Sequence, residues 1–196
     1  MAQTSTTLIS AKSHITSITG TDISLSATAG VYTISATSTV LTGAGKLAVG
    51  DLITVSGSAS NNSTFTVNTV VSTTELTVAE VITSENADGS STITLDHVGF
   101  VSDKAKGDGY YSQPDGVHTV AYQVANDFNA DATIKMQGTL ATTPTEDDWL
   151  DIANTTFTSD TSTLTSSYNF TGNYVWVRSK TQLLTAGTTN SILLNS

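Results

Sequence analysis

Two stretches, Asp51-Leu-Ile-Thr-Val-Ser-Gly57 and Ser91-Thr-Ile-Thr-Leu-Asp96, decide the fold of this chain. In both, apolar residues alternate with threonine or serine, which is the period-two pattern of a half-buried β-strand. The pattern recurs almost from end to end, because about a third of the residues are serine or threonine. These side chains cover the solvent face of a sheet without charge. We therefore expect an all-β protein with a durable, weakly charged surface rather than a reactive cleft.

The composition excludes several classes of function. Cysteine is absent, so no disulfide framework, zinc–thiolate site or thiol nucleophile can form. The net charge is −10 with only seven basic residues, which argues against nucleic acid as a partner, because counterion release needs clustered lysine or arginine. We also expect no signal peptide and no membrane partner, because the first residues lack a basic segment and no stretch approaches about 20 apolar residues. Synthesis in a cytoplasm is therefore expected.

Turn signals and composition predict four segments. Residues 1–24 have few large side chains and indicate an extended N-terminal arm, which needs either the following domain or a neighbouring subunit as its partner. Residues 25–98, with turns spaced roughly as in small β-domains, predict a small five-stranded β-barrel. The polar, glycine-rich residues 99–116 indicate a linker, with a long loop inside one domain as the alternative. Residues 117–196 predict an antiparallel, jelly-roll-like β-sandwich.

No helix of three turns is expected anywhere in the chain. The expected strands are residues 30–35, 51–56, 64–71, 75–79, 92–95, 118–124, 132–138, 149–152, 166–170, 173–179 and 190–194.

The motifs for catalysis and metal binding are incomplete. Gly43-Ala-Gly45-Lys46 lacks the first glycine and the magnesium-binding hydroxyl of a phosphate loop, so we interpret it as a hairpin turn. Asp127, Asn129 and Asp131 alternate as in a calcium loop, but the required glycine and twelfth-position glutamate are missing, which leaves an irregular calcium site or a solvated turn. The three histidines share no metal-ligand spacing, and no Gly-x-Ser-x-Gly elbow occurs.

The densest acidic patch adjoins Trp149 and consists of Glu146, Asp147, Asp148 and Asp151. Such a patch could bind calcium or provide the carboxylate pair of a glycosidase. The simpler interpretation, which we favour, is an acidic loop before a strand whose Trp149 fills the core. We therefore expect no catalytic residue, no cofactor and no metal, and we do not expect an enzyme.

The segment Asn173-Tyr-Val-Trp-Val-Arg178 places Tyr174, Trp176 and Arg178 on one face of a strand. If the valines on the other face are core, this aromatic face must contact something. Together with Trp149, these three residues form the candidate interaction surface. We favour core or subunit interface as their role, and stacking on a glycan, with the help of Tyr110, Tyr111 and Tyr168, remains the alternative.

Several stretches carry a resemblance to a known family. They are 50–57, 64–70, 132–141, 146–152 and 169–178, in a barrel without cysteine and with little charge. In these stretches the chain resembles virion structural proteins of tailed bacteriophages, in particular marine and cyanobacterial ones. The resemblance implies a multi-copy, non-enzymatic part of the virion.

Within that family we expect a capsid decoration or cement protein that docks by its N-terminal part and exposes the C-terminal sandwich. The alternatives are a neck, tail or fibre component, or an adhesin that binds host-surface glycan. The expected partners are other virion proteins and further copies of the chain, with a trimer favoured.

Overall fold

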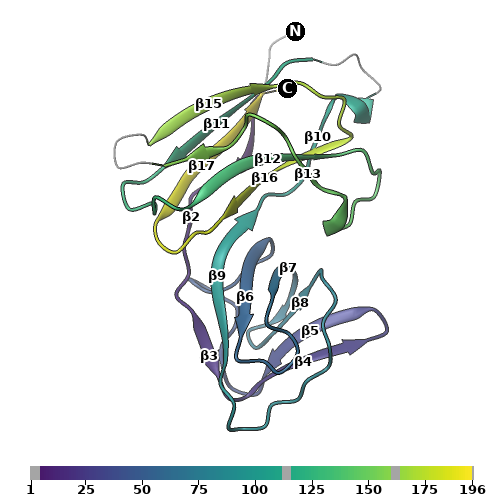
Figure 1. Ribbon diagram of the computed structural model, residues 1–196, viewed down its shortest axis with the longest axis vertical. Helices are drawn as coiled ribbons and strands as arrows, with labels where there is room; N and C mark the ends of the chain where they lie inside the picture. Colours follow the sequence, from purple (N-terminus) through teal and green to yellow (C-terminus); the bar gives the residue numbers. More distant parts are fainter. Residues whose placement is uncertain (1–4, 112–115, 160–163, 196) are drawn as a thin grey trace. The chain divides into compact units, whose positions relative to one another are not determined.

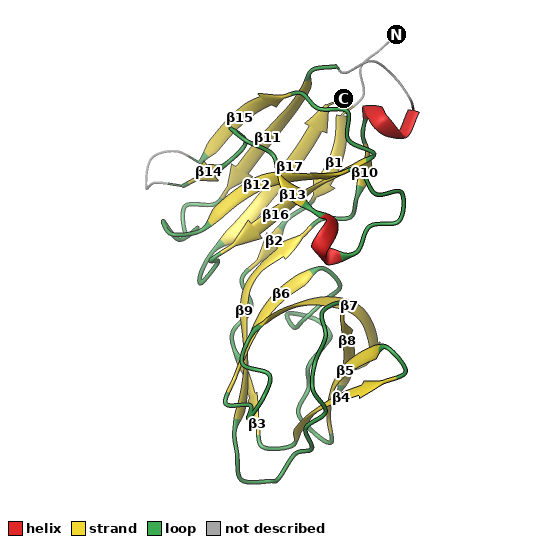
Figure 2. Cartoon of the chain, turned by 45° about the vertical axis from the view of Figure 1, so that its right-hand side comes forward, coloured by secondary structure: helices red, strands yellow, loops and turns green. Residues whose placement is uncertain are grey.

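The computed structural model describes residues 5–111, 116–159 and 164–195 and is all-β (Figures 1 and 2). The helices among these residues are two 3-10 helices, η1 (Asp108–Tyr111) and η2 (Glu146–Asp148), and neither is long enough to span a membrane. The chain divides into two compact units. Unit 1 comprises Met1–His14 and Val101–Ser196, and unit 2 comprises Ile15–Phe100. Unit 2 is therefore inserted into the sequence of unit 1.

Unit 1 is an antiparallel β-sandwich, as predicted for the C-terminal part of the chain. One sheet has the order β1-β17-β11-β15, and β2 also pairs with β17. In the other, β13, β12 and β16 lie side by side, while β14 pairs with β12 and β10 pairs with β16. The bounds in the first sheet are β1 (Ser5–Ile9), β2 (Lys12–Ser13), β17 (Thr188–Asn195), β11 (His118–Val124) and β15 (Thr165–Phe170). Those in the second are β10 (Ala105–Lys106), β12 (Thr133–Thr139), β13 (Leu150–Asp151), β14 (Phe157–Thr158) and β16 (Trp176–Gln182).

The core of unit 1 lies between these two sheets. Alternate residues of β11, among them Val120 and Tyr122, are buried, as are Ile134 and Met136 of β12. The Tyr122 ring packs 6.0 Å from that of Phe157, and its hydroxyl donates to a backbone carbonyl in the loop before β14. Burial of the phenol raises the pKa of Tyr122 well above its ordinary value, and this effect outweighs the hydrogen bond to Thr155, which lowers it. The polar end of the one large core tyrosine is thus satisfied inside the sandwich.

Unit 2 is one continuous row of antiparallel strands in the order β3-β9-β6-β7-β8-β5-β4. Every strand contributes to a single core, so that Ile18 of the first strand and Leu25 of the last share it, as they do in a barrel. Among the described residues, no ladder joins β3 to β4. The bounds are β3 (Ile18–Gly20), β4 (Ile23–Thr28), β5 (Val31–Ala36), β6 (Asp51–Ser56), β7 (Thr64–Ser72), β8 (Glu75–Val78) and β9 (Ile93–Val101).

The predicted arm, residues 1–24, is divided between the two units; residues 1–4 lie outside the described part. The strands β1 and β2 both pair with β17, and Ile9 at the end of β1 is buried. The strand β3 pairs with β9 instead. The arm therefore finds its partners within its own chain. Its few apolar residues are enough to order it, because the arm only adds strands to sheets whose other strands come from the rest of the chain.

The predicted linker, residues 99–116, differs from a flexible connection; residues 112–115 lie outside the described part. The division between the units falls at Phe100, inside the predicted linker, and the residues after it form β10 and η1. A Cβ atom at Gly107 or Gly109 would lie 2.4 or 2.6 Å from a carbonyl oxygen of the neighbouring 173–174 segment. These glycines allow close packing of two backbones rather than flexibility.

Candidate functional site

The outer face of the second sheet of unit 1 carries most of the predicted interaction residues. In the ladder between β12 and β16, Gln137 lies opposite Arg178 and Thr139 lies opposite Trp176. Directly opposite residues of an antiparallel pair point to the same side of the sheet. Val177, between the two β16 residues, is fully buried, so Trp176 and Arg178 share the outer face.

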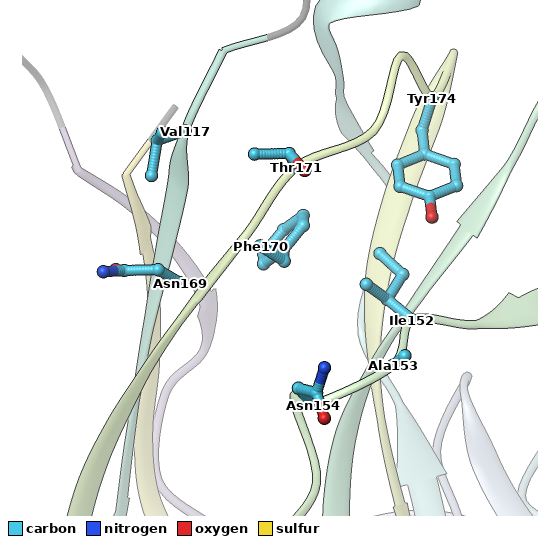
Figure 3. Close-up of a pocket in the computed structure, with 8 residues that line it drawn as sticks. All are labelled: Val117, Ile152, Ala153, Asn154, Asn169, Phe170, Thr171 and Tyr174. Carbon is cyan, nitrogen blue, oxygen red and sulfur yellow. The ribbon is translucent and has the colours of Figure 1, made fainter.

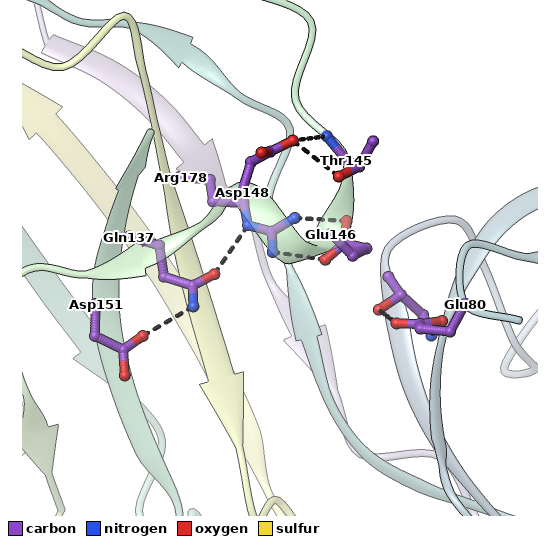
Figure 4. A network of polar contacts seen from close by, with 8 residues as sticks. Glu80, Gln137, Thr145, Glu146, Asp148, Asp151 and Arg178 are labelled. Carbon is purple, nitrogen blue, oxygen red and sulfur yellow. Dashed lines mark hydrogen bonds and ion pairs between the residues drawn. The ribbon is translucent and has the colours of Figure 1, made fainter. Parts of the chain in front are cut away.

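Arg178 is the centre of a polar cluster on this face (Figure 4). Its two terminal nitrogens donate to the carboxylate oxygens of Glu146 at 2.8 and 2.7 Å, and Nε donates to Oε1 of Gln137 at 3.0 Å. The guanidinium carbon lies 4.2 Å from the centroid of the Trp149 ring. These contacts leave Arg178 only 4% exposed. A bidentate carboxylate and an aromatic face are together the environment in which an arginine can be buried.

Trp149 does not fill the core, although the sequence predicts that it would. It is half-buried and lies over the Arg178 guanidinium on the outside of the sheet. The loop that carries it is fixed by Asp148, whose carboxylate accepts hydrogen bonds from the backbone and hydroxyl of Thr145 at 2.7 and 2.8 Å. These two bonds lower the pKa of Asp148 below its ordinary value. The resulting capping box orders η2 and directs Glu146 toward Arg178.

Asp151 extends the same network on β13. It forms an ion pair with Lys135 and accepts a hydrogen bond from Nε2 of Gln137 at 2.8 Å. Partial burial raises its pKa, but the hydrogen bonds from Lys135 and Gln137 outweigh this and hold the pKa below the ordinary value. Lys180 lies opposite Lys135, and its pKa is lowered by burial and by the charges of Arg178 and Lys135. Glu146, Asp148 and Asp151 of the acidic patch thus each serve a different partner.

Trp176 belongs to a cluster of rings and lysines beside Arg178. Its indole nitrogen donates to a backbone carbonyl at 3.0 Å, and its ring lies 4.8 Å from that of Tyr110. Lys104 lies over Trp176 at 4.5 Å, and Lys106 lies over Tyr110 at 4.2 Å and Tyr111 at 5.5 Å. Five of the seven basic residues belong to β10, β12, β16 or the residue before β10. A strongly acidic chain therefore gathers its positive charge around one sheet.

Tyr174 lies apart from Trp176 and Arg178, although strict alternation places it with them. Gly138 is opposite Val177 and so faces the inner side of the sheet, and a Cβ at Gly138 would lie 2.5 Å from the Tyr174 ring. The ring is therefore on the inner side. The alternation fails because residues 171–175 precede β16 and have no strand conformation.

A pocket of about 550 Å³ lies beside the Tyr174 ring (Figure 3). It is formed by the start of β11, the segment after β13, and the end of β15 with the residues that follow it. Its lining residues are Val117, Ile152, Ala153, Asn154, Asn169, Phe170, Thr171 and Tyr174. None of these side chains is charged, and the lining combines aromatic rings with amides and a hydroxyl.

Two buried histidines each lie beside an aspartate. The spacing of the histidines in the sequence does not predict these pairs. In unit 2, His97 accepts a hydrogen bond from the Ile15 amide, and its Nε2 lies 3.4 Å from Asp51. In unit 1, Nε2 of His118 lies 3.2 Å from Asp108, and its ring stacks on Phe170 at 4.9 Å. The first pair joins β9 to β6, and the second joins β11 to η1.

Several carboxylates brace turns by accepting hydrogen bonds from serine and threonine. Asp22 shows the arrangement most fully, because it accepts from both the backbone amide and the hydroxyl of Ser38 and of Thr39. The bonds from Thr39 are the main cause of the lowered pKa of Asp22. Asp88, Glu85 and Asp148 are held in the same way. We call these four residues the turn braces.

Asn129, one of the three residues that alternate as in a calcium loop, forms hydrogen bonds with another segment of the chain. Its carbonyl oxygen accepts from the amides of Thr185 and Ala186, and its amide nitrogen donates to the carbonyl of Leu183. Asn129 therefore fixes a neighbouring loop. Within the part of the chain that the structure describes, no three histidine, aspartate or glutamate side chains gather as a metal site.

Comparison with protein-family models, with curated proteins and with solved structures finds no match for this chain.

Proposed function

We propose that this chain is a non-enzymatic structural subunit of a tailed-bacteriophage virion, present in many copies as a homo-oligomer. Our first choice is a capsid decoration or cement protein, and a neck, tail or fibre component is the alternative. In this proposal unit 2 docks on the particle, and the sandwich of unit 1 faces outward.

The observation that carries the proposal is the use of acidic side chains as turn braces. Each turn brace is ionised at neutral pH, because its pKa is lowered, and each already accepts at least two hydrogen bonds. A carboxylate in this state is a poor proton donor and a good anchor for a turn. The abundant serine and threonine supply the donors. The turn braces and their hydroxyl donors thus hold loops in place, which suits a particle component exposed to the environment.

The distribution of charge supports docking through unit 2. This unit contains seven carboxylates, of which only Asp51 is buried, and one basic residue, Lys46. An acidic surface fits a basic or neutral site on a partner. The affinity for a basic site falls as the salt concentration rises, because salt screens the attraction. The outer face of unit 1 supports oligomer contacts instead, because Trp176 and the exposed Tyr110 and Tyr111 belong to residue types enriched at protein interfaces.

The first experiment measures the mass of the purified chain by light scattering. A trimer of about 61 kDa, three times the 20.3 kDa of the chain, is the expected result. The second is peptide mass spectrometry of phage particles purified from the same source, in which peptides of this chain are expected at high copy number. A monomer at all concentrations, together with absence from the particles, would refute the proposal.

A further inference from the structure

The pocket beside Tyr174 is built around one aromatic ring. A Cβ at Gly138 would lie 2.5 Å from this ring, and a Cβ at Gly172 would lie 2.2 Å from it. Gly172 also has a φ of +148°, which other residues rarely adopt. Two glycines on different segments therefore make room for one side chain.

The backbone of Tyr174 is fixed from two sides. Its amide donates to the carbonyl of Gly172 at 2.8 Å, and its own carbonyl accepts from the amide of Gly109 at 2.8 Å. The ring is thus preorganised, so a ligand that stacks on it loses little conformational entropy from the protein.

The polar groups of the pocket are available to a ligand. Figure 3 shows Tyr174 at one end of the pocket and Asn154 at the other, with Ile152 between them and Phe170 to one side. Within residues 5–111, 116–159 and 164–195, no hydrogen bond engages the Asn154 amide or the Tyr174 hydroxyl. Asn169, in contrast, accepts from the hydroxyl of Thr119 at 2.9 Å and is already used. Asn154 holds a left-handed φ of 59°, and asparagine is one of the few residues that tolerate this conformation.

The lining selects the class of ligand. A charged ligand would lose hydration without meeting an opposite charge, because the lining contains no aspartate, glutamate, lysine, arginine or histidine. A purely apolar ligand would leave the amide and hydroxyl groups unpaired. A neutral sugar offers hydroxyls to Asn154 and Tyr174 and an apolar face to the rings. The volume of about 550 Å³ is within the range of small-ligand sites.

We propose that this pocket binds a neutral saccharide. The site is distinct from the Trp176 face and does not depend on the role in a virion, since a monomeric chain absent from particles would carry the same pocket.

The test applies the full chain to an array of neutral oligosaccharides of glucose, galactose, mannose and their N-acetylated amines, with sialylated and uronate-containing saccharides beside them. We expect binding to neutral saccharides, confirmed by calorimetry with the best free oligosaccharide. Tyr174→Ala and Asn154→Ala should each raise the Kd by about tenfold or more, as loss of a central contact does. The matched control is Tyr110→Ala, which removes an exposed tyrosine of the other face and should leave the Kd unchanged.

Folding of each variant is verified by tryptophan fluorescence and far-UV circular dichroism. Asn154→Ala keeps the test decisive if Tyr174→Ala does not fold, because Asn154 is exposed and outside the core. Absence of binding to every saccharide at millimolar concentration would overturn the proposal. Binding restricted to acidic saccharides, retained in Asn154→Ala and lost in Lys106→Ala, would also overturn it and would locate recognition at the lysine-rich face.

Discussion

Replacing Arg178 by methionine tests whether the outer polar cluster of unit 1 is a structural element. The substitution keeps the unbranched apolar stem of the side chain but removes the hydrogen bonds to Gln137 and Glu146. Gln137 is 5% exposed, so its unpaired carbonyl costs about 1–3 kcal/mol. The Glu146 side chain is 26% exposed, so solvent screens its loss to about 1 kcal/mol or less. Loss of the cation over Trp149 adds roughly 0.5–1 kcal/mol.

These contributions overlap, and we expect a total loss of about 3 kcal/mol in the free energy of unfolding of unit 1. The assay is urea unfolding followed by tryptophan fluorescence, which reports on unit 1 because both tryptophans belong to it. With a slope of about 1.5–2 kcal/mol per molar urea, the midpoint should fall by roughly 1.5–2 M.

Lys135→Met is the matched control on the same face. Its partner Asp151 is 52% exposed, so the loss should stay below about 1 kcal/mol. The reasoning is refuted if Arg178→Met unfolds within about 0.5 kcal/mol of the native chain, or no earlier than Lys135→Met. Combining Arg178→Met with Glu146→Gln should give less than the sum of the two separate losses, since both changes break the same pair.

Three further predictions concern other parts of the chain. Thr155→Val should destabilise unit 1 by about 2 kcal/mol in the same urea assay, because it leaves the buried Met136 amide without its acceptor; an unchanged midpoint would contradict this. Gly57→Ala should lower the far-UV dichroism transition of unit 2 and spare the tryptophan transition, because a Cβ there would lie 2.1 Å from the Thr92 carbonyl; an equal fall in both would show that the units unfold together. Asp22 has a pKa below its ordinary value of 3.8, so its stabilisation is complete above about pH 4 and is lost as the pH falls further. Melting temperatures from pH 7 to 2 should therefore fall more steeply for the native chain than for Asp22→Asn, and parallel curves would exclude this role.

The alternating pattern was a reliable guide where each strand had turn residues on both sides. The strand 51–56 has the predicted bounds in the structure, since Gly50 and Gly57 both hold the positive φ that ends a regular strand. In contrast, β4 was not predicted. Its hairpin to β5 uses Ala29-Gly30, and alanine with positive φ gives no turn signal in the sequence.

The candidate site was only partly predictable, because its chemistry depends on pairings across distant segments. The sequence identifies Trp176 and Arg178 as neighbours on one face, but it contains no sign that Glu146 from another loop will cover the arginine. The side chain of Tyr174 was assigned to the wrong face, because a period of two holds only while the backbone stays extended. The pocket beside this ring depends on Gly138 and Gly172, whose importance appears only when the ring is in place.

The insertion of unit 2 into unit 1 has a consequence for the order of folding. All strands of unit 2 lie within about 90 consecutive residues, so this unit can fold while the chain is still being synthesised. Unit 1 must wait, because β17 lies between β1 and β11 and Ser5 pairs with Asn195. Contacts of such high sequence separation close slowly. A nascent chain would therefore hold β1 exposed, with one sheet of the sandwich incomplete, until its last strand leaves the ribosome.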